Sequence, residues 1–178
     1  MERRVVITGL GAITPIGNNV NETWKGIENK ECGIDNISLF DSSNFKTSLC
    51  AEVKDYNPLD YFEPKQAKRL DRSSQFALIA AREAVKNSGI TSENTDFKKV
   101  GIFVSTGIGG LITIQNQCEV NYEKGNNRVS PMFIPMAIAN MPAGNISIEF
   151  GFKGESMAIV TACSSSTDRK STRLNSSH

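Results

Sequence analysis

The chain has 178 residues, of which 39% are hydrophobic and 22% are charged, as in ordinary globular domains. Its 20 basic and 19 acidic residues give a formal charge of +1, which excludes the basic excess typical of nucleic-acid-binding proteins. The four cysteines lack the paired spacing of zinc sites and disulfide frameworks, so we expect no metal and a reducing, cytoplasmic setting. Because every apolar run is too short for a signal peptide or a membrane span, no membrane partner is expected.

Hydrophobic periodicity divides the N-terminal half into strands and helices. Strands are predicted over 4–10 and 49–53, and helices around Trp24, from Pro64 to residue 70, and over 73–87. Asn19 or Asn21 is expected to cap the first helix, and Gly89 to end the last. The apolar face of helix 73–87 is expected to consist of Phe76, Ile79, Ala80, Ala84 and Val85.

The second half continues the alternation. It predicts strands over 100–105 and 156–161, a glycine turn over 107–110 and a helix over 111–122. Pro135 and Pro142 are expected to divide the apolar region 132–150 into short helical pieces. Strands alternating with helices favour an α/β fold with a mainly parallel sheet, and right-handed crossovers then place helices on both of its faces.

Cys163 is the first candidate for chemistry, because it follows the last predicted strand and precedes a run of serines. A thiol at a strand-to-helix turn gains nucleophilicity from the helix N-terminus. A turn of small residues also leaves backbone N–H groups near the sulfur, where they stabilise a tetrahedral oxyanion. The alternative interpretation, a buried and inert cysteine, is the commoner one for an isolated Ala-Cys-Ser sequence.

Other motifs are less specific. Gly9-Leu10-Gly11 lacks the third glycine of the dinucleotide fingerprint, so nicotinamide binding is excluded. The glycines of 107–110 permit close backbone approach, but no G-K-[ST] follows, so a tight turn is as good an interpretation as phosphate binding. The basic residues of 65–72 suit either an acidic partner or a solvated helix face.

The last eleven residues differ in character. Asp168 to His178 reads as the translation of a common DNA-sequencing library adapter. We therefore assign 1–167 to a truncated domain and 168–178 to a foreign tail, which is left out of the fold prediction.

Five segments in order resemble the β-ketoacyl-acyl-carrier-protein synthase II family of the thiolase-like superfamily. They are Arg3–Gly11, Thr14–Gly17, Ser105–Gly110, Ser130–Pro135 with Asn140-Met141, and Ala158–Ser165. The resemblance implies an α/β chain that is an incomplete N-terminal half of a five-layered α-β-α-β-α fold. Such a half leaves a sheet with an unpaired edge and uncovered apolar faces.

The resemblance also implies a reaction, namely decarboxylative Claisen condensation in type II fatty-acid biosynthesis. Cys163 falls on the family's nucleophile, which takes an acyl chain from the phosphopantetheine of acyl carrier protein, with no cofactor of its own. Malonyl-acyl-carrier protein then loses CO₂ and attacks this thioester. The acyl-pocket positions are Ile108, Leu111 and Phe133, and the carrier-docking positions are Lys65, Lys68, Arg69 and Arg128. The family is homodimeric.

One departure from the family is decisive for activity. The family's two catalytic histidines and lysine come from a second half, whereas the single histidine here is His178. The chain is therefore expected to be inactive in condensation. The alternatives are a polyketide ketosynthase or synthase I, a non-catalytic subunit resembling a chain-length factor, and a small binding protein with a native tail. Cys163 argues against the non-catalytic subunit, because such subunits lack the nucleophile.

Overall fold

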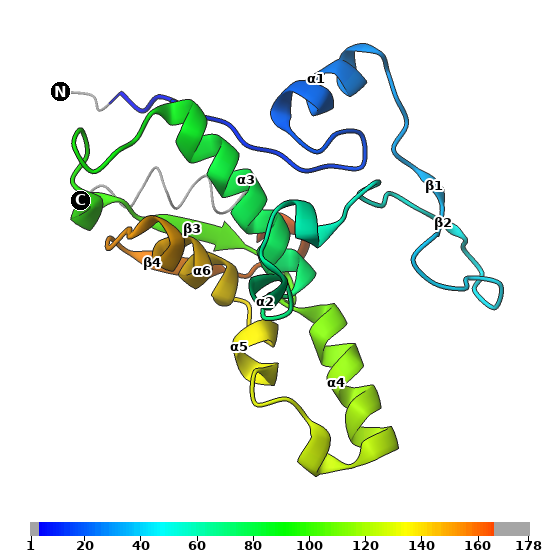
Figure 1. The fold of residues 1–178 in the computed structure, drawn as a ribbon. Coiled ribbons are helices and arrows are strands. Elements are labelled where there is room, and N and C mark those ends of the chain that lie inside the picture. The colour runs from blue at the N-terminus through cyan, green and yellow to red at the C-terminus, as the bar shows by residue number, and fades with distance from the viewer. Residues whose placement is uncertain (1–3, 166–178) are drawn as a thin grey trace.

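A computed structural model describes residues 4–165 (Figure 1). The region assigned to a foreign tail, 168–178, lies outside the described residues. The helices are α1 Val20–Glu28, α2 Pro64–Ala67, α3 Arg72–Ser88, α4 Leu111–Lys124, α5 Phe133–Ala137 and α6 Met141–Phe150. The strands are β1 Asp35–Asn36, β2 Leu49–Cys50, β3 Ile102–Ser105 and β4 Ser156–Ile159.

Helix α3 supplies the centre of the hydrophobic core. Its N-terminus is capped by Asp71. Gly89 ends it in the left-handed conformation, and this end was predicted. The buried apolar side chains of α3 are Leu78 and Ile79, so the prediction for Ile79 is confirmed, but the face is centred on Leu78 rather than on Phe76 and Ala80. The core cluster consists of Phe62, Leu70, Leu78, Ile79, Ile102, Ala143, Ile146 and Phe152.

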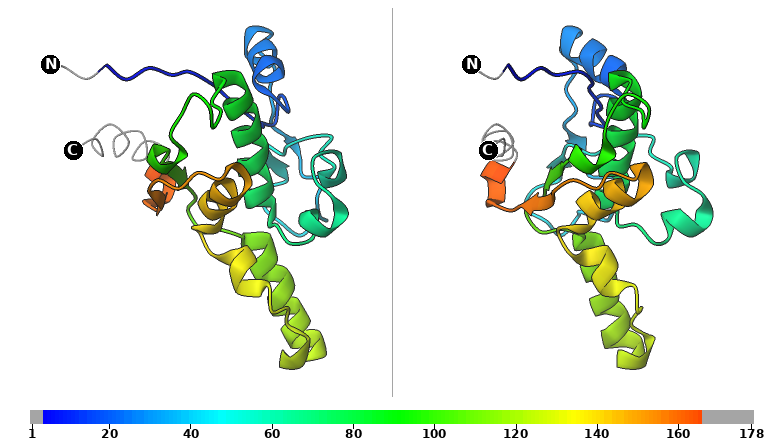
Figure 2. Two further views of the ribbon diagram at one scale, coloured as in Figure 1. Left: turned by 60° about the vertical axis from the view of Figure 1, so that its left-hand side comes forward. Right: turned by 90° about the vertical axis from the view of Figure 1, so that its left-hand side faces the viewer.

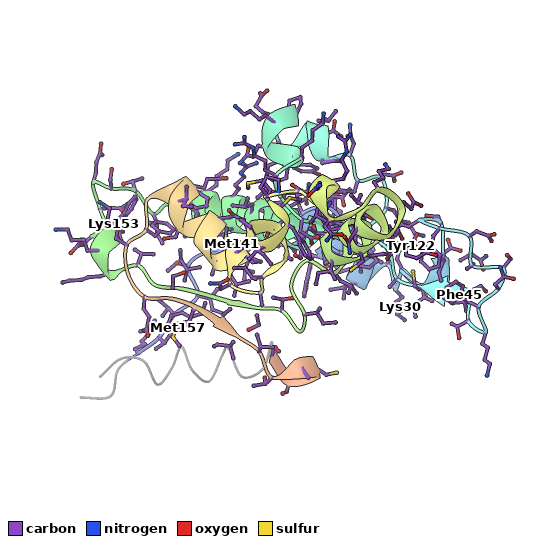
Figure 3. The ribbon with its side chains drawn as sticks, turned by 90° about the horizontal axis from the view of Figure 1, so that it is seen from below. Lys30, Phe45, Tyr122, Met141, Lys153 and Met157 are labelled. Carbon is purple, nitrogen blue, oxygen red and sulfur yellow. The ribbon has the colours of Figure 1, made fainter. Side chains whose placement is uncertain are left out.

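Strands β3 and β4 form a parallel pair, with Ile102 opposite Ser156 and Ser105 opposite Ile159. The connection between them runs through α4, α5 and α6, which confirms the α/β prediction. Helices α3 and α6 pack against each other and lie on one side of this pair (Figure 2). In Figure 3, Met141 marks α6 above the strands and Met157 marks β4. The prediction of helices on both faces is not met within residues 4–165, where these two helices cover one face.

The predicted strand over 4–10 is wrong, because this segment pairs with no other strand among the described residues. The side chain of Ile7 is 75% exposed. Instead, the segment lies along α3, and a Cβ atom at Gly11 would come within 1.8 Å of the Ala80 carbonyl oxygen. The Ala12 N–H also donates to Glu83 at 3.0 Å. A strand needs a partner strand to pair with, whereas Gly9 and Gly11 allow this segment to contact the backbone of α3 instead.

Several shorter elements differ in extent from their predictions. Only Leu49–Cys50 of the segment 49–53 is a strand, paired antiparallel with Asp35–Asn36. Pro135 and Pro142 lie in the first turns of α5 and α6, where a missing N–H breaks no helical hydrogen bond. The region 132–150 is thus divided into two short helices, as predicted, and each proline lies in the first turn of one of them. Asn19 caps α1 by accepting from the Glu22 N–H, as predicted.

Helices α4 and α5 pack on each other and project away from the core as an arm (Figures 1 and 2). Large apolar side chains on and beside this arm are exposed, in line with the expectation of uncovered apolar faces. They include Ile108, Leu111, Ile112, Tyr122, Ile134 and Ile138. In the described part of the chain, every helix is too short or too polar to cross a membrane.

Candidate active site

The candidate nucleophile Cys163 lies in a tight turn just beyond β4. After Ile159 the chain passes through two residues into a single 3₁₀ turn, Ala162–Ser164, and the Cys163 side chain is exposed. The placement of Cys163 after a strand agrees with the prediction, while the helix expected after it lies outside the described residues. The exposed side chain differs from the buried one of the alternative interpretation. An exposed thiol at a strand end is accessible to an incoming thioester.

Local backbone strain marks the same turn. Ala162 has φ of +50°, in the left-handed region, which costs a non-glycine residue roughly 1–2 kcal/mol. Such strained residues cluster at active sites, where the surrounding bonds enforce them. Here Ser165, which is buried, accepts from the Thr161 N–H at 2.9 Å and donates to the Ala162 carbonyl at 2.7 Å. These two bonds hold the strained residue immediately before the thiol.

The expected spare N–H groups are partly absent from this turn. The Ser164 N–H donates to the Thr161 carbonyl, and the Ser165 N–H donates to the Ala162 carbonyl. Neither group points toward an oxyanion beside Cys163, so the expectation of spare donors is wrong at these two residues. The physical reason is that a single 3₁₀ turn uses these N–H groups to close itself.

The glycine loop, Thr106–Gly110, leaves β3 at the same sheet edge. Since β3 and β4 are parallel and in register, both segments begin at the carboxyl end of the pair. Gly109 has φ of +91°, and a Cβ atom there would lie 2.3 Å from the Ala137 carbonyl oxygen. The Gly110 N–H donates to that same oxygen at 2.8 Å. The close approach allowed by the glycines is therefore to α5, which favours the tight-turn interpretation over phosphate binding.

A buried aspartate fixes the other side of the loop. Asp71 is 4% exposed, and its carboxylate accepts hydrogen bonds from residues on two helices. One oxygen accepts from the Ser73 N–H and hydroxyl, at 2.9 and 2.8 Å, and the other accepts from the Thr113 N–H and hydroxyl, at 3.1 and 2.7 Å. Sequence reasoning missed this residue. The only signal for it was an acidic residue two positions before the predicted helix 73–87.

The three predicted acyl-pocket residues lie in consecutive elements of one unit. Ile108 is in the glycine loop and Leu111 begins α4, and both are exposed, while Phe133 begins α5 and is half-buried. Within residues 4–165, the glycine loop and α4 both contact α5, and this contact brings the three residues into one region. The structure thus brings them to the same region without closing a pocket around them.

The basic helix predicted from Pro64 to residue 70 is shorter in the structure, where α2 ends at Ala67 and Lys68 and Arg69 follow it in a turn. Lys65, Lys68 and Arg69 are exposed. Buried Gln75 holds this helix against α3 by donating to the carbonyls of Ala67 and Leu70, at 3.0 and 3.2 Å. The side chain of Gln75 also accepts from the Tyr56 hydroxyl at 2.6 Å. Burial raises the pKa of Tyr56 to about 12, so the phenol stays protonated and remains a donor at neutral pH.

The fourth predicted docking residue stands apart from the others. Arg128 follows α4 at the tip of the arm, whereas α2 lies beside the body near the start of α4 (Figure 1). Helix α4, whose fourteen residues span about 21 Å, runs from the glycine loop to the segment that contains Arg128. Arg72 is also separate, because its guanidinium lies over the rings of Tyr56 and Phe76, at 5.0 and 4.9 Å from their centroids.

A groove of about 500 Å³ lies between α2, α3, α5 and α6. Its apolar lining includes Leu78, Met132, Pro135 and Ile148. The apolar stretch 132–138 therefore lines this groove through Met132 and Pro135, while its Ala137 is buried. Within residues 4–165 no cluster of three or more His, Cys, Asp or Glu side chains suits a metal ion.

Comparison with known proteins identifies relatives of the whole described region. The beta-ketoacyl synthase N-terminal domain model matches residues 2–169. The 3-oxoacyl-[acyl-carrier-protein] synthase 2 of Staphylococcus aureus (strain N315) is 41% identical over 166 residues, which cover 93% of this chain and 40% of that protein. The enzyme of the same name from Coxiella burnetii (strain RSA 493) is 40% identical over 162 residues, or 91% of this chain and 39% of that one. The chain thus spans about 40% of the length of these relatives.

Solved structures of ketosynthases also match this chain. The ishigamide ketosynthase/chain length factor superposes with a TM-score of 0.81 at 28% identity, over 90% of this chain and 40% of that one. A type II polyketide ketosynthase, determined in complex with its acyl-carrier protein, gives the same TM-score at 22% identity, over 98% of this chain and 46% of that one. At that identity the second match speaks for the fold alone.

Proposed function

The chain belongs to the beta-ketoacyl synthase family, and we propose from this premise that Cys163 is the nucleophile of a 3-oxoacyl-acyl-carrier-protein synthase II. The observation that carries the proposal is an exposed thiol at a strained turn, on the same sheet edge as the glycine loop. The relatives named 3-oxoacyl-[acyl-carrier-protein] synthase 2 support the reaction class.

The first step is a thioester exchange on Cys163. The thiolate attacks the carbonyl carbon of an acyl chain carried on phosphopantetheine, so that a new carbon–sulfur bond forms. The carrier's carbon–sulfur bond breaks, and the pantetheine thiol leaves with a proton. In the complete enzyme, malonyl-acyl-carrier protein then loses CO₂, and its carbanion displaces Cys163 to give a β-ketoacyl product. Splitting the reaction in this way suits a sulfur nucleophile.

The other predicted residues take supporting roles in this proposal. Ile108, Leu111 and Phe133 line one wall of the acyl site, which fits their apolar character and their proximity to the glycine loop. Exposed Lys65, Lys68 and Arg69 attract the acidic carrier protein, and Arg128 offers a second, separate basic contact. A cytoplasmic homodimer is the form expected for the complete enzyme.

The 178 residues alone are not expected to complete the condensation. The family uses two histidines and a lysine beyond the nucleophile, and the single histidine of this sequence is His178. Acylation of Cys163 and carbon–carbon bond formation are therefore separable here. The chain should stop at the acyl-enzyme.

The test is acylation by an acyl carrier protein loaded with a hexanoyl or dodecanoyl chain. Intact-protein and peptide mass spectrometry should find the acyl group on Cys163 and should find none in the Cys163→Ala variant. Cys32→Ala is the matched control, because Cys32 is also an exposed cysteine but lies outside the candidate site. Equal acylation of Cys163 and Cys32 would show ordinary thiol reactivity and would refute the proposal.

A polyketide ketosynthase is the second candidate, favoured by the match to the ishigamide ketosynthase/chain length factor. The identity of 41% to the 3-oxoacyl-[acyl-carrier-protein] synthase 2 of Staphylococcus aureus, against 28% to that structure, favours the first candidate. Acylation rates with saturated and β-keto acyl chains separate the two. Preference for a β-keto chain on Cys163 would support the polyketide assignment.

A further inference from the structure

One carboxylate serves as the cap of two helices in this fold. Asp71 is the N-cap residue of α3, and its second oxygen reaches the third residue of α4, Thr113, which lies 42 positions away in the sequence. The residue at the N-cap position of α4 itself is Gly110, which has no side chain to accept these bonds. Asp71 therefore supplies from a distance the cap that α4 lacks.

The same carboxylate limits where the glycine loop can lie. A Cβ atom at Gly110 would lie 2.9 Å from the Asp71 carboxylate and 2.5 Å from the Met136 carbonyl oxygen, so the loop is enclosed from two sides. At its start, the Gly109 N–H donates to the Thr106 hydroxyl at 3.0 Å. The backbone on both sides of Ile108 is thereby fixed, while the side chain of Ile108 is 62% exposed.

We propose that Asp71 is a positioning residue that holds Ile108 in place and so sets which acyl chain lengths Cys163 accepts. Only the part about chain length rests on the proposed function. The loop and the Cys163 turn start at the same edge of the β3–β4 pair, so a side chain fixed in the loop limits the space beside the thiol. A loosened loop admits long chains more readily, because Ile108 no longer occupies one place.

The experiment compares the unsubstituted chain with Asp71→Asn, Thr113→Val and the matched control Asp96→Asn. Asp96 also caps a short helix, by accepting from the Lys98 N–H at 3.0 Å, but it lies outside the loop. Two quantities are measured for each protein. They are the hydrogen-exchange rate of the residue-113 amide and the ratio of the Cys163 acylation rates with dodecanoyl and hexanoyl carrier protein.

Asp71→Asn places an amide where a carboxylate accepted four hydrogen bonds, so we expect the exchange rate at residue 113 to rise on the order of tenfold. The dodecanoyl-to-hexanoyl ratio should rise severalfold. Thr113→Val should change both quantities in the same direction but less, because it removes the hydroxyl bond and keeps the N–H bond. It also keeps the α3 cap, so it decides the question if Asp71→Asn does not fold. Asp96→Asn should change neither.

The outcomes separate the two proposals. An unchanged exchange rate at residue 113 in a folded Asp71→Asn protein overturns the positioning role. An increased exchange rate with an unchanged chain-length ratio overturns the role in selectivity. If the unsubstituted chain is never acylated on Cys163, the proposed function and the selectivity role fail together, and the exchange rate alone decides whether Asp71 positions the loop.

Discussion

The glycine loop allows a sharp test of why its glycines are required. Gly109→Ala places a Cβ atom 2.3 Å from the Ala137 carbonyl oxygen and 3.0 Å from the Ala139 nitrogen. It also forces an alanine to adopt a φ of +91°. The left-handed conformation costs roughly 1–2 kcal/mol, and overpacking against a backbone costs about 1–3 kcal/mol more. The free energy of unfolding should therefore fall by about 2–5 kcal/mol.

Gly107→Ala is the matched control, because it makes the same chemical change in the same loop. A Cβ atom at Gly107 meets no atom within 4 Å, and its backbone lies outside the positive-φ region. Alanine there restricts the unfolded chain, so this variant should be unchanged or more stable by about 0.4–1 kcal/mol.

Urea denaturation followed by far-UV circular dichroism gives the free energy of unfolding for both variants. We expect the urea midpoint of Gly109→Ala to lie well below that of the unsubstituted chain. The midpoint of Gly107→Ala should equal or exceed it. Equal stability of the Gly109→Ala and Gly107→Ala proteins would refute the reasoning. It would mean that the loop moves freely away from α5, and the tight-turn interpretation of the glycines would then be lost.

Three further changes test the core, the polar network and the basic helix. Leu78→Ala should lower the free energy of unfolding by about 2–5 kcal/mol, whereas Leu39→Ala, at a side chain 59% exposed, should change it by less than about 0.5 kcal/mol in the same denaturation assay. Burial raises the pKa of Tyr56 to about 12, above its ordinary value of 10.0, so between these values the folded state keeps a proton that the unfolded state loses. Stability should fall as pH rises through that window, and Tyr56→Phe should remove this part of the fall in a pH series of melts. The double change Lys65→Glu and Arg69→Glu should weaken carrier-protein binding at low salt in calorimetry and change it little at high salt. Unchanged binding would exclude α2 and the turn after it as the docking surface.

Elements with local signals were predictable from the sequence. Asn19 caps α1 and Gly89 ends α3 because each bond or conformation involves residues within one turn of the helix end. The placement of Cys163 after a strand was predictable for the same reason, since a short apolar run followed by small residues sets it locally.

Features that depend on distant partners were not predictable. The segment 4–10 has the composition of a strand, but strand formation needs a paired neighbour, and the described chain provides α3 instead. The bonds of Asp71 to Thr113 and of Gln75 to Ala67 join side chains to groups in other elements. Nothing in the hydrophobic periodicity or the composition of α3 distinguishes Asp71 and Gln75, which are buried, from exposed polar residues.

The two segments at the carboxyl end of the β3–β4 pair are held in different ways, and the difference suits the acyl transfer that we propose. The glycine loop is held by the Ala137 carbonyl, which accepts from the Gly110 N–H, and by Asp71, which bonds to Thr113 in the helix that follows the loop. The Cys163 turn instead closes on itself through Ser165. A wall that faces varied acyl chains needs rigidity, while the turn needs only to place one sulfur. The β3–β4 register sets their relative position, because a slip of one residue would move the thiol about 3.3 Å along the strand. That displacement is as large as the separation of reacting atoms in a near-attack geometry, roughly 3–3.5 Å, so the proposed site depends on the pairing of Ser105 with Ile159.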